Sequence, residues 1–567
     1  MSAIKRSIAC AMTAAMLLGL TACDDEAPNS AANSNAAPDA PAATTSTQAS
    51  TTTDPNAGLD MTDKENKELD TSLAPPSGHA GTLKYLGFYD ITSDQKGTEQ
   101  CLIFQSDVYG GTIDYTSVPF GAAFYDKLAN LIASDDSPDI VTKDAMLRPG
   151  NVSKNLFEPL DGKIDLTTPL WKDIAGVVED FSWKNKHYYY PHRTTTLYAL
   201  NYSKQTIAEN DLTDPYDLYR AGEWTWDAWR DMMIEFCDKD DAHVGFYTTN
   251  HTITSFIATT GTTLIDVQPD GTITNNILSA DVSRAMTFLE GLCRDGLTYD
   301  KSYGDWVSPQ VFSTACNNIL FTCTEPEWTY IAETENLQNK PGVDDDIFDT
   351  VSEFSFVPFP RDPVADKYYT EYDTFGYLVP KGAKNIDGAI EFINLNRMYD
   401  IDPAIQAKVR EDHINPQKIY FEKGKYAGSE KWQMKWGERE YDLWREMCDP
   451  SNFTFINEDA EGFSTDFTDQ IGELLMGVIE RGESWAKTSA EFSPVADGTI
   501  QPFLSSANTP EFRILYPARR FKALCGNIHF DFIKEEPQNE YSKKTPRMWN
   551  GCGNGCRSDR LRRRDPR

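Results

Sequence analysis

Apolar residues recur along this chain at two spacings, one typical of helices and one typical of strands. The segments 120–134, 225–237 and 281–295 place apolar residues three and four positions apart, which predicts amphipathic helices. The segments 82–90 and 354–359 are short, apolar and rich in β-formers, which predicts strands. Because predicted helices and strands alternate at short separations, the pattern predicts an α/β protein with parallel strands.

The N-terminus has the three parts of an export signal. Lys5 and Arg6 precede the apolar run 8–20, which is too short to cross a hydrocarbon core of ~30 Å as a helix. A Leu-Thr-Ala-Cys sequence ending at Cys23 then resembles the bacterial lipobox, in which the cysteine is lipidated. We therefore expect residues 1–22 to be a lipoprotein signal peptide and Cys23 to be the anchor; an ordinary signal peptide or a buried helix is the alternative.

The residues after Cys23 predict a tether. The segment 24–56 contains no aromatic and no large aliphatic residue, so it lacks the apolar surface needed to offset the entropy of ordering it. Together with the charged stretch that follows, residues 23–76 are expected to form a flexible, disordered linker that reaches on the order of 40 Å.

Composition narrows the function classes for the rest of the chain. A net charge of −34 disfavours nucleic-acid binding. The 12 tryptophans and 26 tyrosines suit ligands that have apolar faces and polar edges, although a large core also uses them. Residues 509–567 differ, because basic residues outnumber acidic ones there; this atypical basic tail is an extension or a misread reading frame.

The sequence shows no signature of a catalytic or metal centre. Zinc-protease, nucleophile-elbow and phosphate-loop motifs are missing, and the seven histidines show no helical metal-ligand spacing. We therefore expect no metal, no cofactor and no enzymatic activity. A surface glycoside hydrolase remains the alternative, since 87 acidic residues allow many carboxylate pairs in space.

Several short segments, taken in order, resemble the family 1 extracellular solute-binding proteins that serve ATP-binding cassette (ABC) importers of carbohydrates. The segment 375–392 (Phe-Gly-Tyr-Leu-Val-Pro-Lys-Gly and a following helix) matches best, whereas 312–328 lacks the usual Gly-Lys pair. The other segments are 137–141, 156–160, 183–191, 197–204, 223–227 and 482–486. The resemblance covers about residues 80–508 and rests on the order of the segments.

The resemblance implies a two-lobed periplasmic-binding-protein fold, also called a Venus flytrap, with a ligand cleft between the lobes. Lobe one would hold residues 77–197 with 376–440, and lobe two residues 198–375 with 441–508. It also implies capture of a carbohydrate, expected to be an oligosaccharide, and its delivery to the transmembrane subunits of an ABC permease. The protein is then expected to be a monomer, lipid-anchored on the outer face of the cytoplasmic membrane.

A sugar presents apolar faces and a rim of hydroxyls, which aromatic rings and charged hydrogen-bonding groups recognise. Trp328 occupies, by resemblance, the family's stacking-tryptophan position, and Glu327 and Tyr330 flank it after an apolar strand. Packing in the core is the alternative role for Trp328.

Three further pairs of residues lie where predicted strands end or cross between lobes. Their members are Tyr89 and Asp90, Tyr190 and Arg193, and Tyr372 and Asp373. Each pair is a candidate for ligand contact, because loops at strand ends face the cleft in this fold.

We predict that Trp328→Ala weakens carbohydrate binding by about 1 kcal/mol or more, through loss of ring stacking on the sugar face. Titration calorimetry on the folded variant measures this directly. Unchanged affinity with an intact fold would remove Trp328 from the site.

Overall fold

The structure is a computed structural model. It describes residues 69–92, 99–119, 121–143, 147–247, 250–298, 318–327, 329, 354–415, 418–421, 429–432 and 436–504. By its internal contacts the chain separates into residues 1–510 and 511–567, and all described residues belong to the first unit. The predicted signal peptide, the lipidation site Cys23 and the whole basic tail 509–567 therefore lie outside the described residues.

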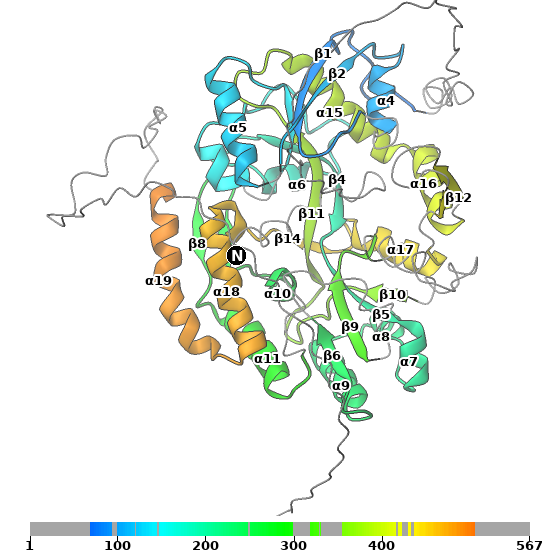
Figure 1. Cartoon of the computed structure of the whole chain (residues 1–567), viewed down its shortest axis with the longest axis vertical. Coiled ribbons are helices and arrows are strands. Elements are labelled where there is room, and N and C mark those ends of the chain that lie inside the picture. Colours follow the sequence, from blue (N-terminus) through cyan, green and yellow to red (C-terminus); the bar gives the residue numbers. More distant parts are fainter. Residues whose placement is uncertain are drawn as a thin grey trace, which may run out of the picture. The chain divides into compact units, whose positions relative to one another are not determined.

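The first sheet has six strands and contains the start of the folded chain (Figure 1). Its strands are β1 (Thr82–Gly87), β2 (Thr112–Ser117), β3 (Ile140–Thr142), β4 (Tyr189–Thr196), β11 (Tyr369–Leu378) and β14 (Thr454–Ile456). β1 pairs in parallel with β2 and β3, and β11 pairs in parallel with β14. β11 runs antiparallel to β3 and β4, so the sheet is mixed.

The second sheet has four strands in the order β10-β5-β9-β6. They are β5 (Ala199–Ser203), β6 (Val244–Tyr247), β9 (Ile319–Thr324) and β10 (Phe354–Val357). Every residue of β5, β9 and β10 is buried, as expected of strands covered on both faces. Two hairpins complete the strands: β7 (Ile265–Val267) with β8 (Ile273–Asn275), and β12 (Lys418–Phe421) with β13 (Ser429–Trp432).

Helices pack around both sheets. They are α4 (Glu99–Gln105), α5 (Ala122–Ala133), α6 (Ala175–Asp180), α7 (Lys204–Glu209), α8 (Pro215–Ala221), α9 (Trp226–Cys237), α10 (Asn250–Ala258), α11 (Ala280–Arg294), α15 (Ile386–Ile401), α16 (Pro403–Ile414), α17 (Glu438–Met447), α18 (Thr465–Arg481) and α19 (Trp485–Leu504). A π-helix spans Leu147–Asn151 and a 3-10 turn spans Ala460–Gly462. None of the helices in the described ranges is long and apolar enough to cross a membrane.

Local signals set where several helices begin. The Thr225 side chain accepts a hydrogen bond from the backbone of Ala228, which confirms the predicted cap of α9. Ser279 caps α11 in the same way, and Gly296, just after that helix, has the positive φ expected at a helix stop. The predicted helix 120–134 is confirmed by α5, and the predicted strands 82–90 and 354–359 by β1 and β10.

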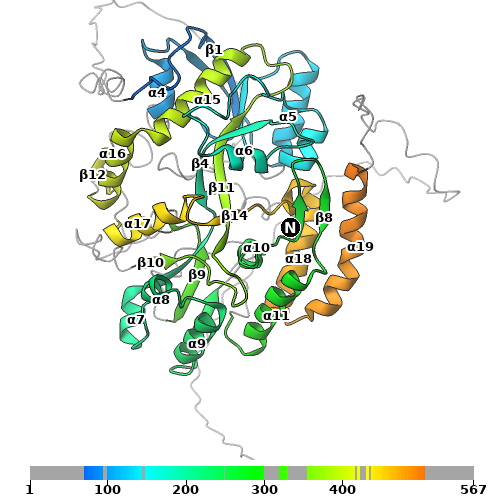
Figure 2. The same ribbon diagram turned by 180° about the vertical axis from the view of Figure 1, so that it is seen from behind.

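Two antiparallel strands connect the sheets. The chain leaves the first sheet at Thr196, the end of β4, and enters the second at Ala199. It returns through β11, which pairs with β4 from Tyr372 opposite Thr196 to Leu378 opposite Tyr189, with a bulge between Phe375 and Gly376. In both views β4 and β11 run between β1 on one side and β9 on the other (Figures 1 and 2).

The remaining parts of the chain add to both regions. α18 packs against α10, α11 and α19, and β14 joins the first sheet beside β11. Residues 69–76, which we assigned to the tether, contact the folded body: Leu69 is buried, and the backbone of Asp70 donates a hydrogen bond to Asp402. The lobe boundaries given above stay a prediction.

The core beside the second sheet is built on Trp229 of α9. Its ring is fully buried and packs edge-on against Phe246, with a centroid separation of 5.0 Å. Phe256 and Phe288 lie at 5.7 and 6.2 Å from the same ring, and Phe321 of β9 at 6.5 Å. One side chain therefore joins α9, α10, α11 and two strands.

We predict that Trp229→Ala lowers the free energy of unfolding by about 3–5 kcal/mol, because a cavity replaces the ring. Urea unfolding followed by circular dichroism measures the change. Leu278→Ala is the control: Leu278 is 56% exposed, so its loss should change stability by less than about 0.5 kcal/mol. Equal stability of the two variants would contradict the assignment of Trp229 to the core.

Candidate functional site

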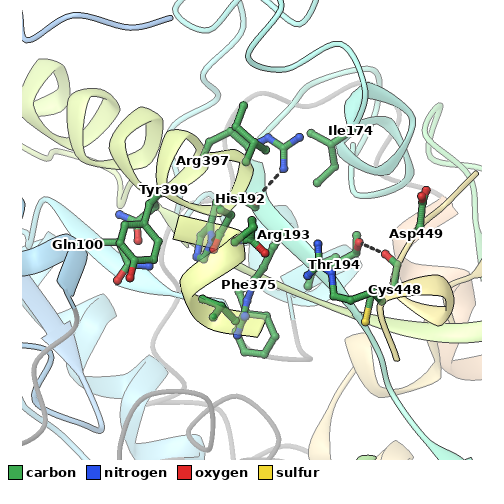
Figure 3. Close-up of a pocket in the computed structure, with 18 of the residues that line it drawn as sticks. Gln100, Ile174, His192, Arg193, Thr194, Phe375, Arg397, Tyr399, Cys448 and Asp449 are labelled. Carbon is green, nitrogen blue, oxygen red and sulfur yellow. Dashed lines mark hydrogen bonds and ion pairs between the residues drawn. The ribbon is translucent and has the colours of Figure 1, made fainter. Parts of the chain in front are cut away.

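A cavity of about 850 Å³ lies against the strands that connect the two sheets. Its walls come from β4 and β11, from the segments that follow β1, β3 and β9, and from helices α4, α15, α16 and α17 (Figure 3). Protein sites for small molecules commonly have volumes of roughly 300–1,000 Å³, so this cavity is of the right size for a ligand of several rings.

The wall formed by β4 is held in place by α15. His192 of β4 hydrogen-bonds through Nδ1 to the carboxylate of Asp400. Arg397 donates from one guanidinium nitrogen to the His192 carbonyl at 2.8 Å and from another to Asp173 at 2.5 Å (Figure 3). Arg397 is buried, and its charge is compensated by Asp173. These hydrogen bonds hold β4 against α15, and they fix the backbone next to Arg193.

Arg193 and Phe375 face the cavity from neighbouring strands. The Arg193 guanidinium lies over the Phe375 ring, 4.4 Å from its centroid, an arrangement that keeps a cation in place without neutralising it. Tyr89, which follows β1, lines the same cavity. Burial raises the pKa of Tyr89 well above its usual range, so its hydroxyl stays protonated and able to donate a hydrogen bond at neutral pH.

Lys143, at the end of β3, also lines the cavity but has its charge compensated. Its ammonium lies 2.8 Å from a carboxylate oxygen of Asp373 and donates to the Thr374 hydroxyl at 3.1 Å. The same group lies 4.9 Å from the centre of the Phe181 ring. Asp373 therefore positions Lys143 and does not itself line the cavity.

A second group of polar atoms lies where α16 and α17 meet the segment after β9. The His413 Nε2 atom is 3.5 Å from a carboxylate oxygen of Glu327, and the His413 ring stacks on Trp444 at 5.6 Å. Within the described part of the chain, Glu327 Oε2, His413 Nε2 and Trp444 Nε1 are buried without a hydrogen-bond partner. All three residues line the cavity, so a modest movement of their side chains on ligand entry would bring these buried atoms into contact with the hydroxyls of a ligand.

The predicted site residues separate into three groups. Tyr89, Arg193 and Glu327 line one cavity although they come from distant parts of the sequence. Trp328 and Tyr330 lie outside the described residues. The remaining four, which are Asp90, Tyr190, Tyr372 and Asp373, are absent from the walls of this cavity. Ligand contact by any of the nine stays a prediction.

Those four side chains have structural partners instead. The Tyr372 hydroxyl donates to Asp180 at 3.2 Å, and its buried ring stacks on Phe455 at 4.5 Å. Tyr190 is buried and packs edge-on against Trp171. Asp90 accepts hydrogen bonds from the backbone and hydroxyl of Thr92, an Asx turn after β1.

Sequence reasoning missed several residues that line the cavity. Phe375 falls inside a segment that resembles the family, and Lys143 lies two residues after another, but the local pattern around both predicts only a strand. His413 and Trp444 lie on helices that carry no motif, and nothing in their local pattern distinguishes them from packing residues. These residues could be found only from their proximity in space, which the sequence pattern does not give.

A cluster of buried carboxylates lies at the other end of β11. Glu371 accepts hydrogen bonds from the Ser255 hydroxyl at 2.6 Å and from the Thr254 hydroxyl at 3.1 Å, both on α10. Glu458, after β14, accepts from the backbone of Leu264 at 2.7 Å. Desolvation raises the pKa of Glu458 to about 8, and the charge of Glu371 adds to the effect.

The next residue, Asp459, pairs with Arg148 of the π-helix segment at 3.3 Å, with both side chains about 4% exposed. Desolvation raises the pKa of Asp459 to about 6 in spite of this partner. Desolvation thus raises the pKa of both Glu458 and Asp459 in the region behind β11, although Asp459 keeps its ion pair with Arg148.

Comparison with known proteins identifies the fold. No family model and no curated protein sequence matches the chain. Among solved structures, the sugar-binding protein MalE of Xanthomonas citri superposes with a TM-score of 0.52 at 14% identity, covering 74% of this chain and 98% of that one. The GacH receptor of Streptomyces glaucescens gives 0.51 at 13% identity, covering 74% and 99%.

A family 1 extracellular solute-binding protein of Bifidobacterium longum subsp. infantis gives a TM-score of 0.51 at 14% identity, covering 74% of this chain and 99% of that one. The chain therefore has the α/β, two-lobed fold of the periplasmic binding proteins, as the resemblance implied. At this identity the likeness establishes the fold and leaves the activity to be argued from the site.

We predict that stability falls as pH rises from about 4.5 to about 8. Over this window the folded protein retains a proton on Glu458 that the unfolded chain has lost, so raising the pH favours unfolding. Glu458→Gln should flatten the dependence by up to about 1.4 kcal/mol per pH unit.

Urea unfolding at several pH values measures the slope. Glu209→Gln is the matched control, because Glu209 is exposed at the end of α7 and should leave the slope unchanged. A slope that stays the same in Glu458→Gln would show that Glu458 titrates normally in the folded protein.

Proposed function

We propose that this protein is an extracytoplasmic solute-binding protein that captures a carbohydrate and delivers it to an ABC importer. The observation that carries the proposal is the cavity of about 850 Å³ beside the two connecting strands, lined by aromatic rings and by polar atoms without partners. Such a lining suits a ligand that has apolar faces and many hydroxyls.

The chemistry of the walls supports a sugar over a purely apolar ligand. Glu327 Oε2 is an acceptor for hydroxyl protons, and Trp444 Nε1 is a donor to hydroxyl oxygens. Phe375 and Tyr89 add ring surface on another side of the cavity. Leaving such buried polar atoms without partners costs roughly 1–3 kcal/mol each, a cost that a hydroxylated ligand would remove.

The similar structures support the same class of ligand. The GacH receptor was solved in complex with acarbose, and the Xanthomonas citri protein is a sugar-binding protein. These proteins act in binding and not in catalysis, and we extend that conclusion to this chain. A surface glycoside hydrolase is the alternative that the experiment below addresses.

Binding would operate by closure of the two lobes about β4 and β11. A ligand that contacts both lobes only in the closed form shifts the population toward closure, and a permease can then recognise the closed shape. Glu327 follows a strand of the second sheet, whereas Tyr89 and Lys143 follow strands of the first, so the cavity draws residues from both sheets.

The anchor completes the proposal. Lipidation of Cys23 with a diacylglycerol and an N-terminal acyl chain would hold the protein on the outer face of the cytoplasmic membrane. The linker after it would keep a monomeric receptor near its permease at high effective concentration.

The test is incubation of the protein with a panel of oligosaccharides, followed by thermal unfolding and by analysis of the sugars. We expect at least one sugar to raise the melting temperature, with a gain in stability of about RT ln(1 + [L]/Kd), and to be recovered unchanged. Release of new reducing ends would support the hydrolase instead, and the lack of any shift across the panel would argue against carbohydrate binding.

Glu327→Gln adds a site-specific readout to that test. Because the substitution removes a charged acceptor but keeps the shape, we expect the affinity for the stabilising sugar to fall by roughly tenfold or more, at nearly unchanged stability without ligand. Glu209→Gln serves again as the surface control. Equal affinity of wild type and Glu327→Gln would place the sugar elsewhere.

A further inference from the structure

The charges around the cavity are unevenly matched. Three of its carboxylates have basic partners inside the protein: Asp400 bonds to His192, Asp173 to Arg397, and Glu99 lies 3.2 Å from the ammonium of Lys408. Lys143, a cation on the same cavity, is paired with Asp373. Each of these four charged groups thus has a partner inside the protein before any ligand arrives.

Arg193 is different. In the part of the chain that the structure describes, its guanidinium forms no ion pair. It makes a cation–π contact with Phe375, 4.4 Å from the ring centroid. The side chain is partly buried and lines the cavity. Arg445, an exposed residue on the cavity wall, likewise forms no ion pair there and lies over the Trp444 ring at 5.5 Å.

An unpaired arginine is unexpected in a chain that has 87 acidic and 53 basic residues. A carboxylate partner for Arg193 would be easy to supply from such a composition. Closing the lobes would remove water from the guanidinium, and a desolvated charge without a counter-charge is costly. A ligand that brings a negative charge to this guanidinium would remove that cost.

Geometry indicates which anion fits. The planar guanidinium presents parallel N–H donors that match a carboxylate in a two-point contact, and its contact with the Phe375 ring uses none of these donors in an ion pair. The protonated hydroxyl of Tyr89, on the same cavity, is a further donor for the anion. A neutral sugar would use these donors without neutralising the charge.

We propose that the ligand is an acidic carbohydrate, one that carries a carboxylate such as a uronic or sialic acid, and that Arg193 is the residue that selects it. This inference rests on the proposed function, because it assigns the ligand class of the same cavity. The neutral part of the ligand would extend toward Glu327, His413 and Trp444.

Calorimetric titration with matched ligand pairs tests the inference. Trigalacturonate is compared with its carboxyl-reduced form, galactotriose, and 3′-sialyllactose is compared with lactose. We expect wild-type protein to bind the acidic member of at least one pair tenfold or more tightly, with an advantage that shrinks as salt is raised.

Variants of Arg193 locate the effect. Arg193→Gln should weaken binding of the acidic sugar by roughly 10- to 100-fold and change binding of its neutral partner by less than twofold, with Arg193→Lys between the two. Arg220→Gln is the control, since Arg220 is an arginine outside the cavity wall that pairs with Glu446 at 2.6 Å. Thermal unfolding without ligand checks that each variant is folded.

The outcomes separate the two proposals. Equal or tighter binding of the neutral members, or an equal loss for both members in Arg193→Gln, would overturn the acidic-ligand inference and leave carbohydrate capture standing. Failure of every sugar in both pairs and in the wider panel would overturn the proposed function and this inference with it.

Discussion

The antiparallel pairing of β4 with β11 is the interaction on which the rest of the structure depends. These strands pair over seven register positions within the first sheet. β4 leads through two residues into β5, and the segment 358–368 leads from β10 into β11, so two chain crossings between the sheets lie at the ends of this pair. Backbone hydrogen bonds define the register of the pair, and buried side chains such as Tyr189 and Tyr377 hold it against helices. We expect relative movement of the two sheets to bend the β4–β11 pair or the segments at its ends.

The surroundings of the β4–β11 pair differ in electrostatics between the cavity and the region near Glu371 and Glu458. Around the cavity, Asp400, Asp173 and Glu99 have basic partners, whereas the guanidinium of Arg193 lies over the Phe375 ring and forms no ion pair within the described residues. Near Glu371 and Glu458 it buries carboxylates, and the pKa of Glu458 is raised to about 8 as a result. The first arrangement favours recognition of a polar solute, and the second links the stability of the connecting region to protonation.

Much of the fold follows from local sequence signals. Thr225 and Ser279 cap the helices that their positions predict, and the apolar segment 354–359 contains a buried strand. The site was predicted less completely: Tyr89, Arg193 and Glu327 line one cavity, whereas Tyr190 and Tyr372 are buried by aromatic neighbours. Periodicity reports which face of an element is buried.

Periodicity does not report which distant elements meet, however. His413 and Trp444 reach the cavity because α17 packs against β4 and α16 packs against α17. Their partners are far away in the sequence, and each helix taken alone shows only an ordinary packing pattern. The lack of an ion-pair partner for Arg193 among the described residues likewise depends on its surroundings and cannot be predicted from the neighbouring sequence.

The bulge between Phe375 and Gly376 sets how this site can change over evolutionary time. A β-carbon at Gly376 would lie 2.7 Å from the Tyr189 ring and 3.0 Å from the backbone of Pro191, so this position is closed to larger residues. Phe375 next to it faces the cavity and can be exchanged without disturbing that packing. Insertion or deletion of one residue here would reverse the facing of every later side chain in β11. Substitution at Phe375 could therefore change ligand specificity, whereas a change in the length of β11 would disrupt its packing.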